Sequence, residues 1–223
     1  MRDVRIIARV DVKGENVINT IHLEGLRVVG NPNLLVQKYY EQGADEIILI
    51  DQVASLYQRE HLLELTKKFA EKIFVPLTVG GGITSVEQAK ALLRSGADKV
   101  AINTSVTKSP HLITELATHF GSQCVAVSIQ AKKNDEGSWE VFRDGGRERT
   151  GIDVLYWAKR VVELGAGEIL VTSIDRDGTR KGYDTDLMSN ISKLVNVPIV
   201  ASGGLGKPEH AVDLMKETEC DAL

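Results

Sequence analysis

The sequence predicts an α/β fold: a (β/α)8 barrel of the TIM type, built from two half-barrel repeats in a single domain over residues 1–223. Two observations predict it. Short β-branched runs alternate with segments of helical periodicity, which is the pattern of parallel α/β proteins. Motifs of the first half also recur in the second half at a nearly constant spacing, which indicates two copies of a four-strand unit.

The predicted strands are short apolar runs, each followed by a turn. In chain order they are 5–11, 46–51, 76–80, 98–103, 123–130, 168–173 and 197–202. Helices are expected at 32–43, 57–72, 84–95, 109–119, 152–165, 184–194 and 207–217. Gly43 and Gly96 are expected to end helices before a strand, and Thr84 or Ser85 is expected to cap a helix start. No linker rich in Pro or Ser separates two domains.

The repeat is clearest around glycines. Residues 75–82 (VPLTVGGG) match residues 197–204 (VPIVASGG) 122 positions later, and residues 96–98 similarly match residues 219–221. The last three residues therefore correspond to the beginning of an eighth strand. We expect a C-terminally incomplete barrel that lacks the eighth strand and helix, which would leave open edges on its first and seventh strands. Either a C-terminal segment is disordered or cut away, or another chain completes the barrel by exchange.

Composition argues against several classes of function. The formal net charge is −4 and aromatic residues make up 5%, so no basic stripe or stacking surface predicts a nucleic-acid partner. No apolar stretch approaches the ~18 residues that span a bilayer, and no secretory signal is visible, so we expect a cytoplasmic protein without membrane contact. Cys124 and Cys220 are expected to be reduced thiols. No metal-ligand spacing is visible, and neither a metal nor a cofactor is predicted.

Polar residues at the ends of strands one and five are the candidate catalytic residues. Asp11 ends the first strand, at the mouth where the loops of such a barrel carry the chemistry, and Arg9 shares its face. A partly desolvated carboxylate can act there as general acid or base, although Asp11 could instead cap the following loop. The repeat places Gln130 at the corresponding position of the second half. Because glutamine does not exchange a proton near neutral pH, the pair lacks a second carboxylate.

Glycine-rich turns predict two anion sites on opposite sides of the mouth. The first comprises Gly81, Gly82, Asn103 and Thr104. The second comprises Asp177, Gly178, Thr179, Ser202, Gly203 and Gly204. Backbone N–H groups at a helix start bind phosphate well, although tight strand-to-helix packing also requires glycine. Two such sites related by the repeat favour an elongated ligand with a phosphate at each end.

Four charged residues lie near the starts of strands one, two, four and six. They are Arg5, Glu46, Lys99 and Glu168. On an inward-facing layer, two positive and two negative side chains would neutralise one another as a ring. The alternative is four separately solvated charges at strand starts.

The ordered motifs cover almost the entire chain. They include residues 5–8, 11–13, 79–83, 96–100, 102–104, 120–123, 165–170, 172–179 and 201–204. Together they resemble the cyclase (HisF-type) subunit of imidazole glycerol phosphate synthase. The resemblance implies a barrel that receives ammonia from a glutaminase subunit docked at its bottom, as a heterodimer, and uses it at the top on a bis-phosphorylated substrate. It also implies that the four charged residues form an ammonia gate.

Two departures from that family affect the expected chemistry. Gln130 replaces the second catalytic aspartate, and Asn19 replaces a lysine that reaches the substrate. Residues 21–30, 39–46 and 53–57 look more like a paralogous branch that accompanies a glutaminase-like protein and an amidotransferase. That branch is thought to help convert an acetamido sugar to an acetamidino sugar for surface polysaccharide.

We therefore expect an ammonia-using lyase or synthase subunit of a glutamine amidotransferase complex, acting on an amino sugar or another phosphorylated small molecule. Asp11 would be its acid/base carboxylate, and Gln130 would orient ligand or water. One alternative is a true histidine-biosynthesis cyclase that makes imidazole glycerol phosphate. An alternative of another class is a non-catalytic scaffold that activates the glutaminase.

Overall fold

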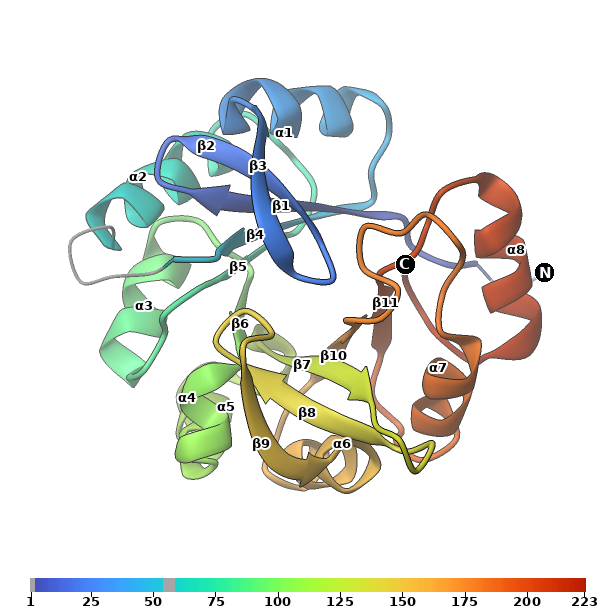
Figure 1. Cartoon of the computed structure of the whole chain (residues 1–223). Helices are drawn as coiled ribbons and strands as arrows, with labels where there is room; N and C mark the ends of the chain where they lie inside the picture. Colours follow the sequence, from blue (N-terminus) through green and yellow to red (C-terminus); the bar gives the residue numbers. More distant parts are fainter. Residues whose placement is uncertain (1–2, 54–58) are drawn as a thin grey trace.

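The computed structural model describes residues 3–53 and 59–223. Seven parallel strands curl around a common axis, with helices on the outside (Figure 1). Around the ring their order is β1, β4, β5, β6, β7, β10 and β11. Their bounds are β1 Ile7–Lys13, β4 Glu46–Asp51, β5 Leu77–Gly80, β6 Lys99–Ile102, β7 Val125–Lys133, β10 Glu168–Ser173 and β11 Ile199–Ser202. The seven strands predicted from the sequence are thus present, in the predicted order, as a (β/α)8-barrel fold.

Residues 221–223 close the ring between β11 and the start of β1. Ala222 forms parallel bridges with both Arg5 and Val200. Leu223 N donates to Arg5 O at 3.0 Å, and Ile7 N donates to Leu223 O at 2.8 Å. The expectation that the first and seventh strands have open edges is therefore wrong at their starts, because three residues in eighth-strand position already pair with both.

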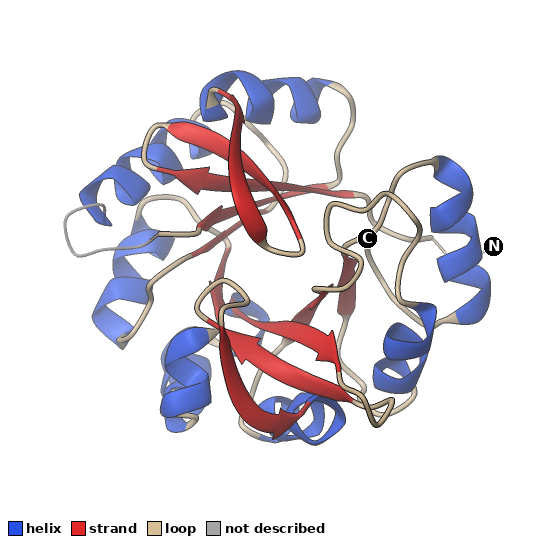
Figure 2. Cartoon of the chain, viewed as in Figure 1, coloured by secondary structure: helices blue, strands red, loops and turns tan. Residues whose placement is uncertain are grey.

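The helices cover the outer face of the sheet (Figure 2). Their bounds are α1 Pro32–Glu41, α2 Arg59–Ala70, α3 Val86–Arg94, α4 Thr104–Lys108, α5 His111–Phe120, α6 Val154–Glu163, α7 Thr185–Ser192 and α8 Pro208–Glu217, with a 3-10 turn at Ser122–Cys124. Ser85, one of the two predicted caps, begins α3 by accepting a hydrogen bond from Gln88 N. The helix expected at 57–72 is described from Arg59 onward, and positions 57–58 lie outside the described residues.

Two antiparallel hairpins that the sequence did not predict extend from the C-terminal ends of β1 and β7 (Figure 1). The first consists of β2 (Asn16–Ile21) and β3 (Glu24–Gly30), and the second of β8 (Trp139–Arg143) and β9 (Glu148–Asp153). Six of the seven β3 residues are exposed, so the sequence carries no alternation of buried and exposed positions there. The hairpins follow strands one and five and therefore repeat between the two halves.

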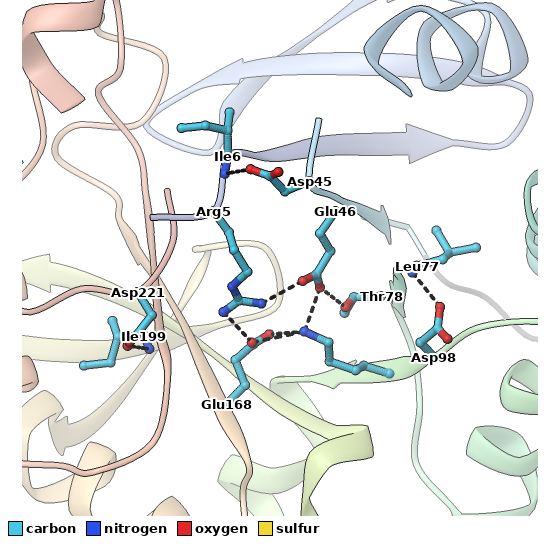
Figure 3. Close-up of polar contacts among 11 residues, drawn as sticks. Arg5, Ile6, Asp45, Glu46, Leu77, Thr78, Asp98, Glu168, Ile199 and Asp221 are labelled. Carbon is cyan, nitrogen blue, oxygen red and sulfur yellow. Dashed lines mark hydrogen bonds and ion pairs between the residues drawn. The ribbon is translucent and has the colours of Figure 1, made fainter. Parts of the chain in front are cut away.

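At three places, an aspartate accepts a hydrogen bond from the backbone at the start of a neighbouring strand (Figure 3). The backbone N–H to carboxylate distances are 2.7 Å for Ile6 to Asp45, 2.8 Å for Leu77 to Asp98 and 2.9 Å for Ile199 to Asp221. Asp98 and Asp221 correspond in the sequence repeat, as do Leu77 and Ile199. The repeat in sequence is therefore also a repeat of contacts.

The interior of the barrel is apolar in its middle layer. Ile48, Leu170, Val200 and Ala222 form a buried cluster there, with Ile7 packed against it. The larger core lies between sheet and helices. Burial of each such aliphatic side chain contributes roughly 1.5–3 kcal/mol to folding. The apolar layer separates charged residues at the strand starts from polar residues at the strand ends.

Candidate active site

At the strand starts, the four predicted charges form a closed cycle of alternating sign (Figure 3). Arg5 Nη1 lies 2.9 Å from Glu46 Oε2, and Arg5 Nη2 lies 3.1 Å from Glu168 Oε2. Lys99 Nζ lies 2.8 Å from Glu46 Oε1 and 2.9 Å from Glu168 Oε1. The Glu46 and Glu168 side chains are only 1% and 7% exposed. Four separately solvated charges, the alternative interpretation, do not describe this arrangement.

At the opposite end, β1 places Asp11 at the mouth of the barrel. Its Oδ1 accepts hydrogen bonds from Arg9 Nε and from Gln52 Nε2, both at 3.0 Å. The Asp11 side chain is 16% exposed, so it is partly removed from water. Within the described residues it accepts no backbone N–H of the following loop. The contacts therefore favour a positioned carboxylate over a loop cap.

Arg9 adds a cation to the mouth. Its Nη1 donates to Thr172 Oγ1 at 2.9 Å and to Ser202 Oγ at 3.2 Å, which ties β1 to β10 and β11. Burial alone would lower the pKa of the Arg9 guanidinium. The charge and hydrogen bond of Asp11 and the charge of Asp177 outweigh burial and raise that pKa above its ordinary value. Arg9 is therefore cationic at every working pH.

Gln130 lies on β7 and is 7% exposed. Its Oε1 accepts from Gly146 N, in the turn between β8 and β9, at 2.8 Å. This bond determines which end of the carboxamide is the oxygen. The amide nitrogen makes no hydrogen bond to the described residues and can donate to a ligand. Gln130 therefore has a donor available for a bound group but no proton to exchange.

A cavity of about 290 Å³ joins the first predicted phosphate site to the centre of the mouth. Its lining includes Gly81, Gly82, Asn103, Thr104, Arg9, Gln52 and Gln130. At Gly81 the φ angle is +120°, and an added Cβ would lie 2.5 Å from Asp51 O, so only glycine fits. Arg9 and Gln52 are the two residues that bind the Asp11 carboxylate. The cavity therefore joins the first phosphate site to Gln130 and to the two residues that bind Asp11, although Asp11 itself does not line it.

Ser105 and Lys108 line the same cavity. The Ser105 hydroxyl is buried and has no hydrogen-bond partner among the described residues. A buried polar group left without a partner costs about 1–3 kcal/mol, which a ligand oxygen would offset. Lys108 contributes a positive charge. The hydroxyl of Thr104, in contrast, already accepts from Asp144 N at 3.0 Å.

The second predicted anion site is not part of this cavity in the described part of the chain. The Asp177 carboxylate accepts from Thr20 Oγ1 at 2.8 Å and from Leu23 N at 3.1 Å, both in the β2–β3 hairpin. Gly178 packs against the backbone of Thr20, and Thr179 Oγ1 donates to Arg176 O at 2.7 Å. These residues bond within the protein.

The remaining members of the second set are also engaged. Ser202 Oγ accepts from Arg9, as described above. Gly203 and Gly204 have φ angles of +96° and +104°. A Cβ at these positions would meet Ser173 O and Gly182 O, respectively. Close packing therefore accounts for both glycines.

Asp51 ends β4 and lines the mouth cavity, although the sequence analysis did not single it out. Burial raises the pKa of its carboxyl, and the hydrogen bond from Val53 N and the charge of His61 oppose that rise. The sequence feature that could have identified Asp51 is its position at the end of a predicted strand. Arg9 carried a similar signal, because it shares the inward face of β1 with Asp11.

Two structural features are absent from the described residues, 3–53 and 59–223. Their His, Cys, Asp and Glu side chains form no group of three or more that could hold a metal ion. Their helices include none with the length and apolarity needed to cross a membrane. Cys124 and Cys220 form no disulfide within the described residues; the first is half-buried and the second buried.

Comparison with known proteins places these features in a family. Residues 5–223 match the family described as "Histidine biosynthesis protein". The chain is 59% identical over 210 residues to "Imidazole glycerol phosphate synthase subunit HisF" of Legionella pneumophila, covering 94% of this chain and 99% of that protein. It is 50% and 49% identical over 218 residues to proteins of the same name from Bacillus cereus strains Q1 and G9842, covering 98% of this chain and 86% of each relative.

The resemblance inferred from the ordered motifs is thereby confirmed for the HisF type. None of these three names refers to the amino-sugar branch. Of the motifs that suggested that branch, residues 54–57 lie outside the described residues. The chain belongs to the histidine biosynthesis protein family, as a homologue of the HisF subunits of imidazole glycerol phosphate synthase.

Proposed function

We propose that the chain is the ammonia-using cyclase subunit of an imidazole glycerol phosphate synthase, a glutamine amidotransferase complex of histidine biosynthesis. The names of its relatives favour this alternative over the amino-sugar interpretation. One structural observation carries it: a single mouth cavity joins the predicted phosphate loop at Gly81 and Gly82 to the two residues that hold Asp11.

At the mouth, the residues have separate roles in this proposal. A substrate phosphate binds at Gly82 and Asn103, where Ser105 and Lys108 add a hydroxyl donor and a positive charge. Asp11 exchanges a proton with the reacting group as a general acid or base. Gln130 donates from its amide nitrogen and orients the substrate or a water molecule.

At the opposite end, the charge ring acts as a gate for ammonia. Neutral ammonia can cross the apolar layer around Ile48 and Leu170, whereas ammonium would have to lose its hydration. A glutaminase subunit docked at this end, as a heterodimer, is the proposed source. Phe74, which is 83% exposed and contacts Tyr40 with ring centroids 6.4 Å apart, and the 49% exposed Ile6 offer it apolar contacts.

The direct test supplies the protein with the bis-phosphorylated ribulosyl substrate of the histidine pathway and excess ammonium. Formation of imidazole glycerol phosphate is measured beside a Gln130→Asp variant. We expect turnover by the unmodified protein, because Gln130 can position groups while Asp11 transfers protons. No turnover by either protein would contradict the proposal. Turnover by Gln130→Asp alone would show that the site accepts the substrate but that the natural chain lacks the activity.

Gln130 is also the observation that favours a second candidate. A carboxamide in place of a catalytic carboxylate fits the amidation of an acetamido sugar to an acetamidino sugar, in which ammonia would react with a different acceptor. A scaffold that only activates the glutaminase would need the charge ring and neither polar mouth residue. Asp11→Asn separates the scaffold from both enzymes, because only the scaffold tolerates it.

A further inference from the structure

Arg9 has hydrogen-bonding capacity that the protein leaves unused. A guanidinium carries five N–H donors. The Nε–H of Arg9 binds Asp11, and the two N–H groups of Nη1 bind Thr172 and Ser202. Nη2 has no partner among the described residues, although Arg9 lines the mouth cavity and its side chain is only 18% exposed.

The charge of Arg9 is also less completely balanced than that of the two cations in the charge ring at the strand starts. Arg5 and Lys99 each contact two carboxylates. Arg9 contacts only Asp11, whose oxygen also accepts from Gln52, and the second carboxylate that acts on it, Asp177, does so by charge without an ion pair. Across the mouth, Gln130 is neutral. A buried cation with one shared carboxylate and a vacant donor edge attracts a further anion.

The position of Arg9 is fixed before any ligand binds. Its guanidinium is held by one carboxylate and two hydroxyls on three strands, so little side-chain freedom remains to be lost on binding. Because both N–H groups of Nη1 are occupied, the free edge offers a contact through Nη2 rather than a two-pronged clamp. Any anionic oxygen can satisfy it, from a carboxylate or from a phosphate.

We propose that Arg9 binds an anionic group of the substrate at the centre of the mouth, so that the cavity selects sugar phosphates carrying a second anion along the same carbon chain. The first anion is the phosphate at Gly81 and Gly82, so this inference rests on the phosphate site of the proposed function. Arg9 is a substrate-binding residue in addition to positioning Asp11.

Three six-carbon probes that differ only at one end test the proposal by calorimetric titration of the protein. Sorbitol 6-phosphate ends in a hydroxymethyl group, 6-phosphogluconate in a carboxylate and sorbitol 1,6-bisphosphate in a second phosphate. We expect at least one of the two doubly anionic probes to bind about tenfold more tightly than sorbitol 6-phosphate, as expected for an added charge-assisted hydrogen bond. The tighter of the two identifies the source of the anionic oxygen.

Arg9→Met should reduce this preference to about twofold or less, because no cation remains at the centre. Arg27→Met is the matched control: it removes the same charge from an exposed position on β3 and should leave the preference unchanged. Thermal unfolding checks that the variants fold. Thr172→Val provides a second test that keeps the charge but removes one hydroxyl that fixes Nη1, and should weaken the preference by about threefold.

The outcomes separate this inference from the proposed function. Equal binding of all three probes to the unmodified protein would overturn the role of Arg9 and leave the phosphate site intact. A preference that survives both Arg9→Met and Thr172→Val would do the same. If none of the probes bound, both the Arg9 role and the phosphate site would be contradicted, whereas turnover with ammonium tests the cyclase activity independently.

Discussion

The two ends of the barrel use the same residue types in opposite ways. At the strand starts, two cations and two carboxylates satisfy one another in a closed cycle. At the strand ends, Arg9 shares a single carboxylate with Gln52, and the facing residue, Gln130, is neutral. A closed network stabilises the fold and, in the proposed function, controls the passage of ammonia, whereas an open network keeps donors available for a ligand. The predictions below test this contrast.

The largest effect is expected from Asp11→Asn at the mouth. The variant keeps an oxygen that can accept from Arg9 and Gln52 but removes the one carboxylate that Arg9 contacts, so some loss of stability is expected and thermal unfolding checks that the variant remains folded in the assay. Without a proton-exchanging group, turnover with free ammonium should fall about 10²–10⁴-fold. Steady-state rates with the bis-phosphorylated substrate measure this loss. Unchanged turnover of the complex would instead support the scaffold.

At the other end, the ring should matter most for stability. Lys99 bridges both buried glutamates, so Lys99→Met leaves them with Arg5 as their one cation and should lower the free energy of unfolding by about 3–5 kcal/mol. Arg5→Met should cost less, because the Arg5 side chain is 35% exposed and water can replace it. Urea unfolding of both variants gives the comparison. A larger loss from Arg5 would show that the burial argument is wrong.

Arg5→Ala tests whether the charge ring controls the passage of ammonia, rather than whether it stabilises the fold. In complex with the glutaminase, glutamine-dependent turnover should fall about tenfold, equivalent to ~1.4 kcal/mol, because the cycle no longer closes around the ammonia path. Turnover with free ammonium, which can enter from the mouth, should change much less. Equal losses with both nitrogen sources would rule out the gate. Arg27→Met, remote from the ring, serves as the control.

The sequence carried enough information to predict one end of the barrel better than the other. Strand starts lie in β-branched runs of regular period, so Glu46, Lys99 and Glu168 were placed correctly on one inward layer. Asp11 was placed by the same alternation. These residues depend on local periodicity and on the repeat, both of which can be recognised in a single chain.

The mouth depends on contacts between distant segments, which periodicity does not encode. The β2–β3 hairpin was not predicted, because β3 is mostly exposed and its sequence carries no alternation of apolar and polar residues, yet Thr20 and Leu23 of that hairpin donate to the Asp177 carboxylate. The repeat assigned residues 221–223 to the beginning of an eighth strand, but a segment of three residues is too short to predict that Ala222 already pairs with both neighbouring strands. The unused donors of Arg9 become visible only once the partners of its other three donors are known.

The smallest expected effect comes from Asp51, a buried carboxyl without the cation partners of the ring. Because burial raises its pKa, the stability that its proton provides is fully present below the ordinary pKa of 3.8 and is lost as pH rises through the higher folded-state pKa. Asp51→Asn keeps an acceptor for Val53 N and, because the amide does not ionise, avoids the loss of stability that ionisation of Asp51 causes at neutral pH. Its melting temperature at pH 7 should exceed that of the unmodified protein by about 2–4 °C, corresponding to ~1 kcal/mol. The difference in melting temperature between Asp51→Asn and the unmodified protein should disappear near pH 3.5. In contrast, Glu46→Gln, which removes a charge from the ring, should lower the melting temperature at pH 7. A gain for Asp51→Asn that persists at low pH would mean that ionisation is not its cause.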